Sequence, residues 1–132
     1  MKKPESFCID THSLVWYFTG QKTLSETAKS LLDQLFFSTE ITGFISIIVL
    51  LEIFHLSLKK PQFAYPVFLQ HLKRVNLPIV SLDQTILTHA YSLPKNLDIH
   101  DRIIAATALY TKSILITKDR MLHQVKGLHT LW

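Results

Sequence analysis

The chain has 132 residues, 48% of them hydrophobic, and its 14 Lys and Arg against 10 Asp and Glu give a formal net charge of +4. This length favours one compact domain over residues 1–132, which buries roughly two thirds of the surface of the unfolded chain and leaves no room for a second domain. The single cysteine, Cys8, excludes an intrachain disulfide, so we expect a small core residue and a reducing cytoplasm.

Apolar patterning in the first half of the chain predicts two strands and four helices. The strands are expected at Ser6–Ile9 and Ile41–Ser46, and the helices at Leu14–Phe18, from the capping-box spacing Thr23–Glu26 through Leu35, from Ile47 to about Leu58, and at Phe63–Leu72. Residues 44–54 are the most apolar stretch, but they are fewer than the roughly 20 residues that cross a membrane. We therefore expect this stretch in the core and no membrane association.

The second half continues the alternation of short strands with helices. Strands are expected at Pro78–Val80, Ser113–Thr117 and His129–Trp132, and helices from the capping-box spacing Ser81–Gln84 through Ala90, from Ile99 through Leu109, and as one turn at Met121 and Leu122. This order predicts an α/β fold, with a central parallel sheet of about five strands and helices on both faces.

The helix from Ile99 opens with two acids, and they allow two interpretations. In the local one, Asp98 is the N-cap and Asp101 lies in the first turn, where both satisfy free amides and the helix dipole, an arrangement worth roughly 1 kcal/mol. In the functional one, Asp101 belongs to a site with three further acids that stand in or beside apolar segments: Asp10, Glu52 and Asp119. A buried ionised carboxylate needs a partner or a metal, so each of these acids requires an explanation.

Parallel strands end at one edge of a sheet, and that edge is where ligands of such folds bind. Asp10 and Asp119 directly follow predicted strands, and Asp101 starts a helix that can reach the same edge. Crowded carboxylates repel one another unless a cation neutralises them, and oxygen ligands suit Mg²⁺ or Mn²⁺. We therefore expect a metal-dependent nuclease. Zinc is disfavoured because one cysteine and seven scattered histidines show no paired ligand spacing.

Several polar and basic residues are candidates for supporting roles. Thr11 and Thr117 could hydrogen bond to ligands or only cap strand ends, and His12 and His100 could transfer protons or simply be solvated. The basic surplus fits a polyanionic partner such as RNA. Its candidate contacts are Lys59, Lys60, Lys73, Arg74, Lys118 and Arg120, although lysines at helix ends are usually dipole partners.

An ordered set of motifs resembles the PIN-domain family, and within it the VapC-like toxins. The motifs are Asp10-Thr11-His12 with Leu14 and Trp16, then Ser46 with Glu52-Ile53, then residues 101–108 (DRIIAATA), then residues 115–119 (LITKD). The resemblance covers nearly the whole chain and implies a PIN-like three-layer sandwich. It further implies a Mg²⁺-dependent endoribonuclease, the toxin of a type II toxin–antitoxin system, commonly dimeric.

Carried over residue by residue, the resemblance places the acidic site at Asp10, Glu52, Asp101 and Asp119, with Asp98 as an additional acid. The chain departs from some relatives after Asp119, where Arg120-Met121-Leu122-His123 supplies no further acid, so a second metal site is in doubt.

Two other functions compete with a nuclease. A receiver-type phospho-signalling domain needs paired acids after the first strand, but here Asp10 stands alone. A non-catalytic RNA-binding or partner-binding module would use the same scaffold, although a pure phosphate binder gains nothing from a negative pocket.

A partner surface is expected on the helices of residues 24–37 and 63–72. They carry Phe36, Phe37, Phe63, Tyr65 and Phe68, more aromatic side chains than one face of a small domain readily buries. We expect this surface to bind an antitoxin segment that brings a basic side chain to the acidic pocket, and to support self-association as a homodimer.

Overall fold

The computed structural model describes residues 5–61, 63–75 and 77–132, and within them it holds a five-stranded sheet in the order β3-β2-β1-β4-β5. All of its pairings are parallel, and Phe7 in the central strand lies beside Gly43 on one side and Ile114 on the other. The strands are β1 (Ser6–Ile9), β2 (Thr42–Ser46), β3 (Ile79–Val80), β4 (Ile114–Ile116) and β5 (Thr130–Leu131). The expected parallel α/β sheet is confirmed.

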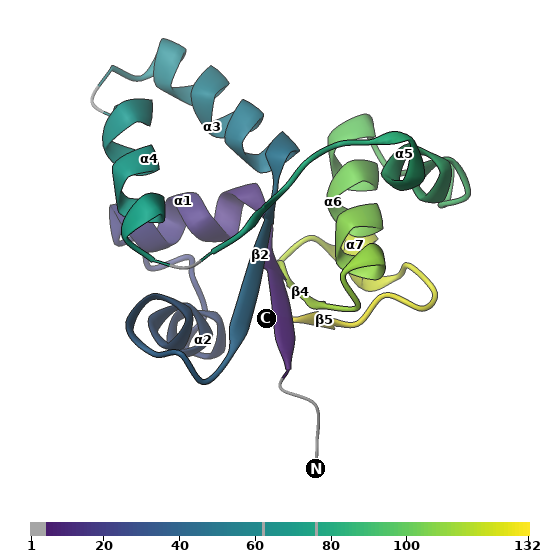
Figure 1. Ribbon diagram of the computed structural model, residues 1–132, viewed down its shortest axis with the longest axis horizontal. Helices are drawn as coiled ribbons and strands as arrows, with labels where there is room; N and C mark the ends of the chain where they lie inside the picture. The colour runs from purple at the N-terminus through teal and green to yellow at the C-terminus, as the bar shows by residue number, and fades with distance from the viewer. Residues whose placement is uncertain (1–4, 62, 76) are drawn as a thin grey trace.

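Seven helices accompany the sheet within the described residues. They are α1 (Thr11–Thr19), α2 (Glu26–Phe37), α3 (Ile47–Lys59), α4 (Tyr65–Arg74), α5 (Gln84–Tyr91), α6 (Ile99–Tyr110) and α7 (Arg120–His123). Figure 1 shows α1, α2 and α4 on one side of the sheet and α5, α6 and α7 on the other. The chain therefore forms three layers.

Three helices begin at residues other than those expected, because the capping side chain differs. Asp10 caps α1, which therefore begins at Thr11 and not at Leu14. The N-cap of α2 is Ser25, whose hydroxyl accepts the amide of Ala28 at 3.0 Å. The N-cap of α5 is Asp83, whose carboxylate accepts the amide of Ile86 at 2.9 Å. The expected capping boxes at Thr23–Glu26 and Ser81–Gln84 were thus wrong in position; the actual caps place Ala28 and Ile86 in the core.

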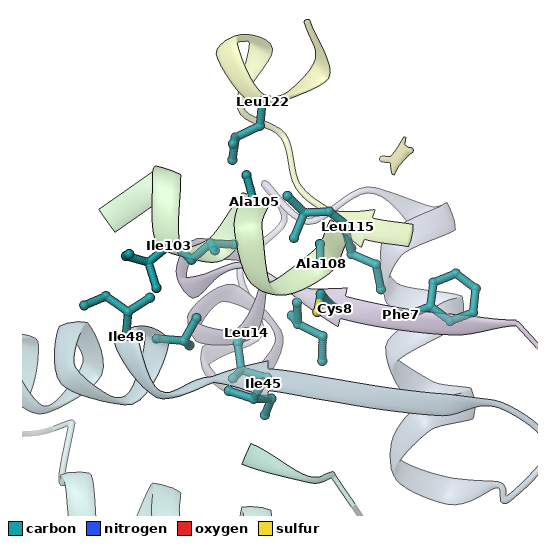
Figure 2. Packing of buried hydrophobic residues seen from close by; sticks show 14 of the residues in the cluster. Phe7, Cys8, Leu14, Ile45, Ile48, Ile103, Ala105, Ala108, Leu115 and Leu122 are labelled. Carbon is teal, nitrogen blue, oxygen red and sulfur yellow. The ribbon is translucent and has the colours of Figure 1, made fainter. Parts of the chain in front are cut away.

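The buried core lies between the central strands and α6, as Figure 2 shows for Cys8, Ala108 and Leu115. Small residues let α6 approach the sheet closely, because Ala105 and Ala108 are fully buried. Cys8 is buried as expected, and burial raises the pKa of its thiol to about 11. This thiol is inert at neutral pH.

The aromatic side chains of α2 and α4 are packed more than the sequence pattern indicated. Phe68 is only 3% exposed, and Phe36 and Phe68 both contact the ring of Phe18 on α1, with centroids 5.2 and 5.0 Å away. Phe37 remains 84% exposed. The expected aromatic partner surface on these helices is therefore mostly internal packing, because α1 is itself aromatic and covers it.

Exposed apolar residues gather instead along one face of α3. Ile47, Leu51, Phe54 and Leu58 recur at helical spacing and are all exposed. In the described part of the chain, no helix is long and apolar enough to cross a membrane. A stripe of this kind on a helix is typical of a protein-protein contact.

Arg102 on α6 holds the connection that leads into that helix. Its guanidinium donates to the carbonyl oxygens of Ala90 at 2.6 Å, Leu93 at 3.1 Å and Pro94 at 2.8 Å. These carbonyls lie at the end of α5 and in the connection that follows it, so one planar side chain bridges three points of the turn. The start of α6, with Asp98 and Asp101, is fixed by this contact.

Replacing Arg102 with Ala should lower the free energy of unfolding by about 2 to 3 kcal/mol, since it removes several hydrogen bonds from a charged donor. Urea denaturation measures this change. Arg120→Ala is the matched control, because Arg120 is exposed on α7. Equal stability of the two variants would show that the turn does not depend on Arg102.

Candidate functional site

Asp10 ends β1 and caps α1, and both of its carboxylate oxygens have donors. Oδ1 accepts the amide of Ser13 at 2.8 Å, and Oδ2 accepts the hydroxyl of Thr117 in a short hydrogen bond. The side chain is only 6% exposed. Asp10 is therefore held in place just after the central strand by two donors, one on α1 and one after β4.

Thr117 links Asp10 to the next acid along the edge. It directly follows β4, and its hydroxyl oxygen also accepts the amide of Asp119 at 3.1 Å. The ring of His123 contacts the Thr117 carbonyl through Nε2 at 2.7 Å. Asp119 in turn caps α7 by accepting the amide of Met121. The turn after β4 is therefore held from both sides.

Glu52 reaches the same edge from α3. Its Oε1 accepts the hydroxyl of Thr11 at 2.7 Å, and its Oε2 lies 3.5 Å from Nδ1 of His100. Thr11 follows Asp10 directly, and His100 precedes Asp101. These contacts place the Glu52 carboxylate between the start of α1 and the start of α6.

Asp98 and Asp101 open α6 as the local interpretation predicted. The carboxylate of Asp98 accepts the amide of Asp101 at 2.8 Å, so Asp98 is the N-cap. The same structure also supports the wider grouping. Burial raises the pKa of Asp101 from its ordinary 3.8 to about 7, and the charges of Asp98, Asp119 and Glu52, with a hydrogen bond to Asp119, add to the rise.

The acids meet at the topological switch point of the sheet. From β1 the chain passes to β2 and β3 on one side, and β4 and β5 lie on the other. The ends of β1 and β4 are therefore adjacent, with Asp10 after one and Thr117 and Asp119 after the other. This is the crevice where open parallel sheets bind ligands.

The chemistry of these donors fits a divalent cation, although their present geometry is not that of a finished metal site. Among the described residues, no three His, Cys, Asp or Glu side chains stand where they could jointly hold a metal ion. In favour of a cation, burial raises the pKa of Asp101 to about 7, and the neighbouring carboxylates add to the rise. A hard cation can replace the proton of this carboxyl group, since Mg²⁺ and Mn²⁺ take carboxylate oxygens.

A groove leads away from the acids between α1 and α3. Its volume is about 660 Å³, and its walls include Thr11, Trp16 and Glu52 near the acids and Lys59 and Lys60 at the end of α3. Lys118 and Arg120 flank Asp119 and are exposed. The structure thus places four of the six expected basic contacts along the groove or next to the acids.

The other two basic candidates lie elsewhere. Arg74, at the end of α4, lines a separate cavity together with Thr42 and Gly43 at the start of β2. Lys73 lines a shallow depression with Pro78 and Ile79, at the start of β3. The starts of the strands face away from their carboxyl ends, so the structure does not bring Lys73 and Arg74 to the acids.

The sequence reasoning gave no site role to Ser13 or His123, and it named Trp16 only as part of a motif. Buried Ser13 supplies an amide to Asp10 and donates its hydroxyl to the Ile116 carbonyl, and the spacing of Asp10 and Ser13 is that of an N-cap pair. Trp16 shares the groove with His12, a spacing of four residues that becomes visible once α1 begins at Thr11. The contact of His123 with Thr117 had no sequence signal.

A family model described as PIN domain matches residues 7–128. No curated protein matches the chain. Similar solved structures include VapBC2 from Rickettsia felis bound to a promoter DNA fragment, with 20% identity over 96% of this chain and 98% of that chain and a TM-score of 0.74. A toxin–antitoxin complex from Klebsiella pneumoniae has 23% identity over 95% of each chain and a TM-score of 0.72. DNA-bound VapBC from Salmonella typhimurium has 17% identity over 96% of this chain and 97% of that chain, with a TM-score of 0.71.

The raised pKa of Asp101 predicts a pH-dependent stability in the absence of metal. The folded chain keeps the proton up to about pH 7, whereas the unfolded chain loses it near 3.8, so stability falls as the pH rises between these values. Asp101→Asn should remove this loss and raise the free energy of unfolding by about 1 to 2 kcal/mol at pH 8, a figure reduced from the full shift because the side chain is half-buried.

Urea denaturation between pH 4 and pH 8 tests this expectation, and the gain should vanish at pH 4. Asp83→Asn is the matched control, because Asp83 also caps a helix but stands on exposed α5. A loss of stability at pH 8 in Asp101→Asn would mean that the carboxylate serves the helix dipole and is not crowded by other acids.

Proposed function

Since the chain belongs to the PIN domain family, we propose that it is a Mg²⁺- or Mn²⁺-dependent endoribonuclease and the toxin of a toxin–antitoxin pair. The observation that carries the proposal is the meeting of acids from separate elements around Asp101. Its neighbours come from the N-cap of α6, from the N-cap of α7 and from α3, and burial together with their charges raises its pKa to about 7. A fold that tolerates this repulsion gains from it only when a cation is bound.

In this proposal Asp10, Asp101 and Asp119, with Glu52, hold the cation. A bound Mg²⁺ or Mn²⁺ supplies an activated water and offsets the charge that develops on the phosphate. The hydroxyl of Thr117 donates to Asp10 and orients its carboxylate, and the hydroxyl of Thr11 does the same for Glu52. Asp101 must give up its proton and move with Asp119 toward a common point, because these side chains are not yet arranged as ligands.

RNA is the proposed polymer because the basic residues line the path to the acids. Lys59 and Lys60 stand along the groove, and Lys118 and Arg120 flank Asp119. Cations at these points can hold phosphates on either side of the reacting one. We propose RNA and not another nucleic acid as the substrate because the motifs of the chain resemble those of VapC-like toxins.

An antitoxin is the proposed protein partner. The relatives with similar folds include a toxin–antitoxin complex, and in this chain the exposed stripe of Ile47, Leu51, Phe54 and Leu58 runs along α3 beside the groove. Leu51 also lines the groove with Glu52. An apolar segment lying on this stripe could extend a basic side chain to Glu52 and Asp101 and so compete with the cation and with RNA.

We also propose that the chain forms a homodimer. Exposed Leu87 and Tyr91 of α5 and Ile99 of α6 border a depression of about 480 Å³. This patch is separate from the α3 stripe, so a second copy and an antitoxin can be bound together. Light scattering on the purified chain should give twice the mass of one chain.

The alternative is a non-catalytic RNA-binding or partner-binding module on the same scaffold. One observation favours it, the lack of three metal-ready ligands among the described residues. The raised pKa of Asp101 favours the nuclease, because a binder of phosphate has no use for crowded acids. Receiver-type signalling has no support in this geometry.

Cleavage of total RNA by the purified chain should require Mg²⁺ or Mn²⁺ and stop in a chelator. Asp101→Asn should reduce the rate by at least about 100-fold, since it removes a proposed ligand, whereas Asp83→Asn should cut at the normal rate. Gel analysis of end-labelled RNA measures both rates. Unchanged cleavage by the Asp101 variant would refute the assigned site, and binding of RNA without any cleavage by the wild type would favour the alternative.

Replacing Leu51 and Phe54 with Ser should weaken binding of the co-encoded antitoxin by about tenfold or more, because both side chains would lie at the centre of the contact. Isothermal titration calorimetry measures the affinity. Tyr91→Ser is the control, since Tyr91 is also a large exposed side chain but stands on α5. The same affinity in all three proteins would remove the α3 stripe as the antitoxin site.

A further inference from the structure

The indole of Trp16 has an imidazole, a second indole and a lysine ammonium as neighbours. This half-buried indole has the ring of His12 at 5.6 Å, the ring of Trp132 at 5.9 Å and the ammonium of Lys118 over its face at 5.9 Å from the centroid. Two of these neighbours, His12 and Lys118, are exposed. The indole is therefore bounded by groups that can move.

Trp132 packs against the buried core, as do Val15 and Tyr17 on either side of Trp16, whereas Trp16 is not among the described residues that do so. Trp16 meets the edge of Trp132 and lines the groove between α1 and α3. Trp132 thus acts as a support that fixes the indole from the protein side.

The indole also stands beside the acids. Thr11, which holds Glu52, lines the same groove, and Lys118 lies between Thr117 and Asp119. A nucleotide resting on Trp16 would therefore have its phosphate within reach of Lys118. Glu52 lines the same groove, so a strand that continued along it would pass toward the acids.

The contact between Lys118 and the indole is one that RNA can replace. A cation over an exposed aromatic ring is held weakly, and an ammonium binds a phosphate more strongly. When Lys118 moves to a phosphate, it leaves the face of Trp16 free for a base. Stacking on an aromatic side chain tolerates any base, because every base has a π face.

We propose that Trp16 is a stacking platform for one unpaired base of the RNA, next to the phosphodiester that is cut. This inference rests on the proposed ribonuclease function and narrows its substrate to single-stranded RNA or an unpaired loop. A base within a duplex is stacked on its neighbours and cannot lie on the indole without being extruded. In this proposal an unpaired strand is therefore bound better than duplex RNA.

The two tryptophans of the chain allow a direct test. In a Trp132→Phe, Asp101→Asn double variant, fluorescence reports Trp16 alone while cleavage is blocked. Titration in Mg²⁺ with a single-stranded hexa-adenosine RNA should quench the emission, because a stacked base quenches indole. The matched duplex and inorganic polyphosphate, which offer phosphates without a free base, should not quench it.

Fluorescence polarisation of a labelled RNA then measures the affinity for RNA of single variants that keep Trp132. Trp16→Leu should weaken binding by roughly tenfold or more, and Trp16→Phe should restore most of it. Phe37→Leu is the matched control, since Phe37 is an exposed aromatic residue at the far end of α2. Thermal melting of each variant shows whether it is folded, and the quenching test does not depend on these variants.

Each result tests either the stacking role of Trp16 or the proposed ribonuclease function. Equal quenching by polyphosphate, or none by the RNA strand, overturns the platform, even if the wild type cleaves RNA and the ribonuclease stands. Quenching by the strand alone in a chain whose wild type never cleaves RNA supports the platform and refutes the ribonuclease. Quenching by the antitoxin but not by the strand would assign Trp16 to the protein partner and overturn its role with RNA.

Discussion

Repulsion between carboxylates at one edge of the sheet is the constraint on which the rest of the structure depends. Asp101 meets Asp98, Asp119 and Glu52 there, and its pKa rises to about 7 as a result of burial and these charges. Each neighbour has a compensating donor: an amide of α6 for Asp98, an amide of α7 for Asp119, and Thr11 for Glu52. The fold thus satisfies the hydrogen bonds of these acids, but the repulsion between their charges remains unless a cation neutralises it.

The scaffold holds these groups in place from several directions. The parallel pairing of β1 with β4 brings Asp10 to Thr117, and the alanines of α6 let that helix lie against the strands. Arg102 then fixes the turn from which α6 starts. The acids come from different elements. A ligand bound by all of them would therefore also connect elements from both faces of the sheet at this edge.

Sequence patterns predicted the strands and the order of the helices, since hydrophobic periodicity is a local feature. Contacts that depend on the pairing of distant strands were not accessible, such as that of Thr117 with Asp10. Two N-caps were predicted at the wrong residues. The spacing of three residues from a cap to its partner fits Thr23 and Ser81 as well as Ser25 and Asp83, so the local sequence does not select between them. The aromatic residues of α2 and α4 were predicted to form a partner surface, because no local sequence pattern shows that Phe18 packs against them.

The central claim is that crowded carboxylates form a cation site, and the titration of Asp101 tests it most directly. Carbon-13 NMR of aspartate-labelled protein follows its carboxyl group from pH 4 to pH 9, with Asp101→Asn providing the assignment. Without metal the carboxyl should titrate near pH 7, and saturating Mg²⁺ should move the midpoint below about 5 because the cation displaces the proton. A midpoint near 4 that Mg²⁺ does not change would contradict the account.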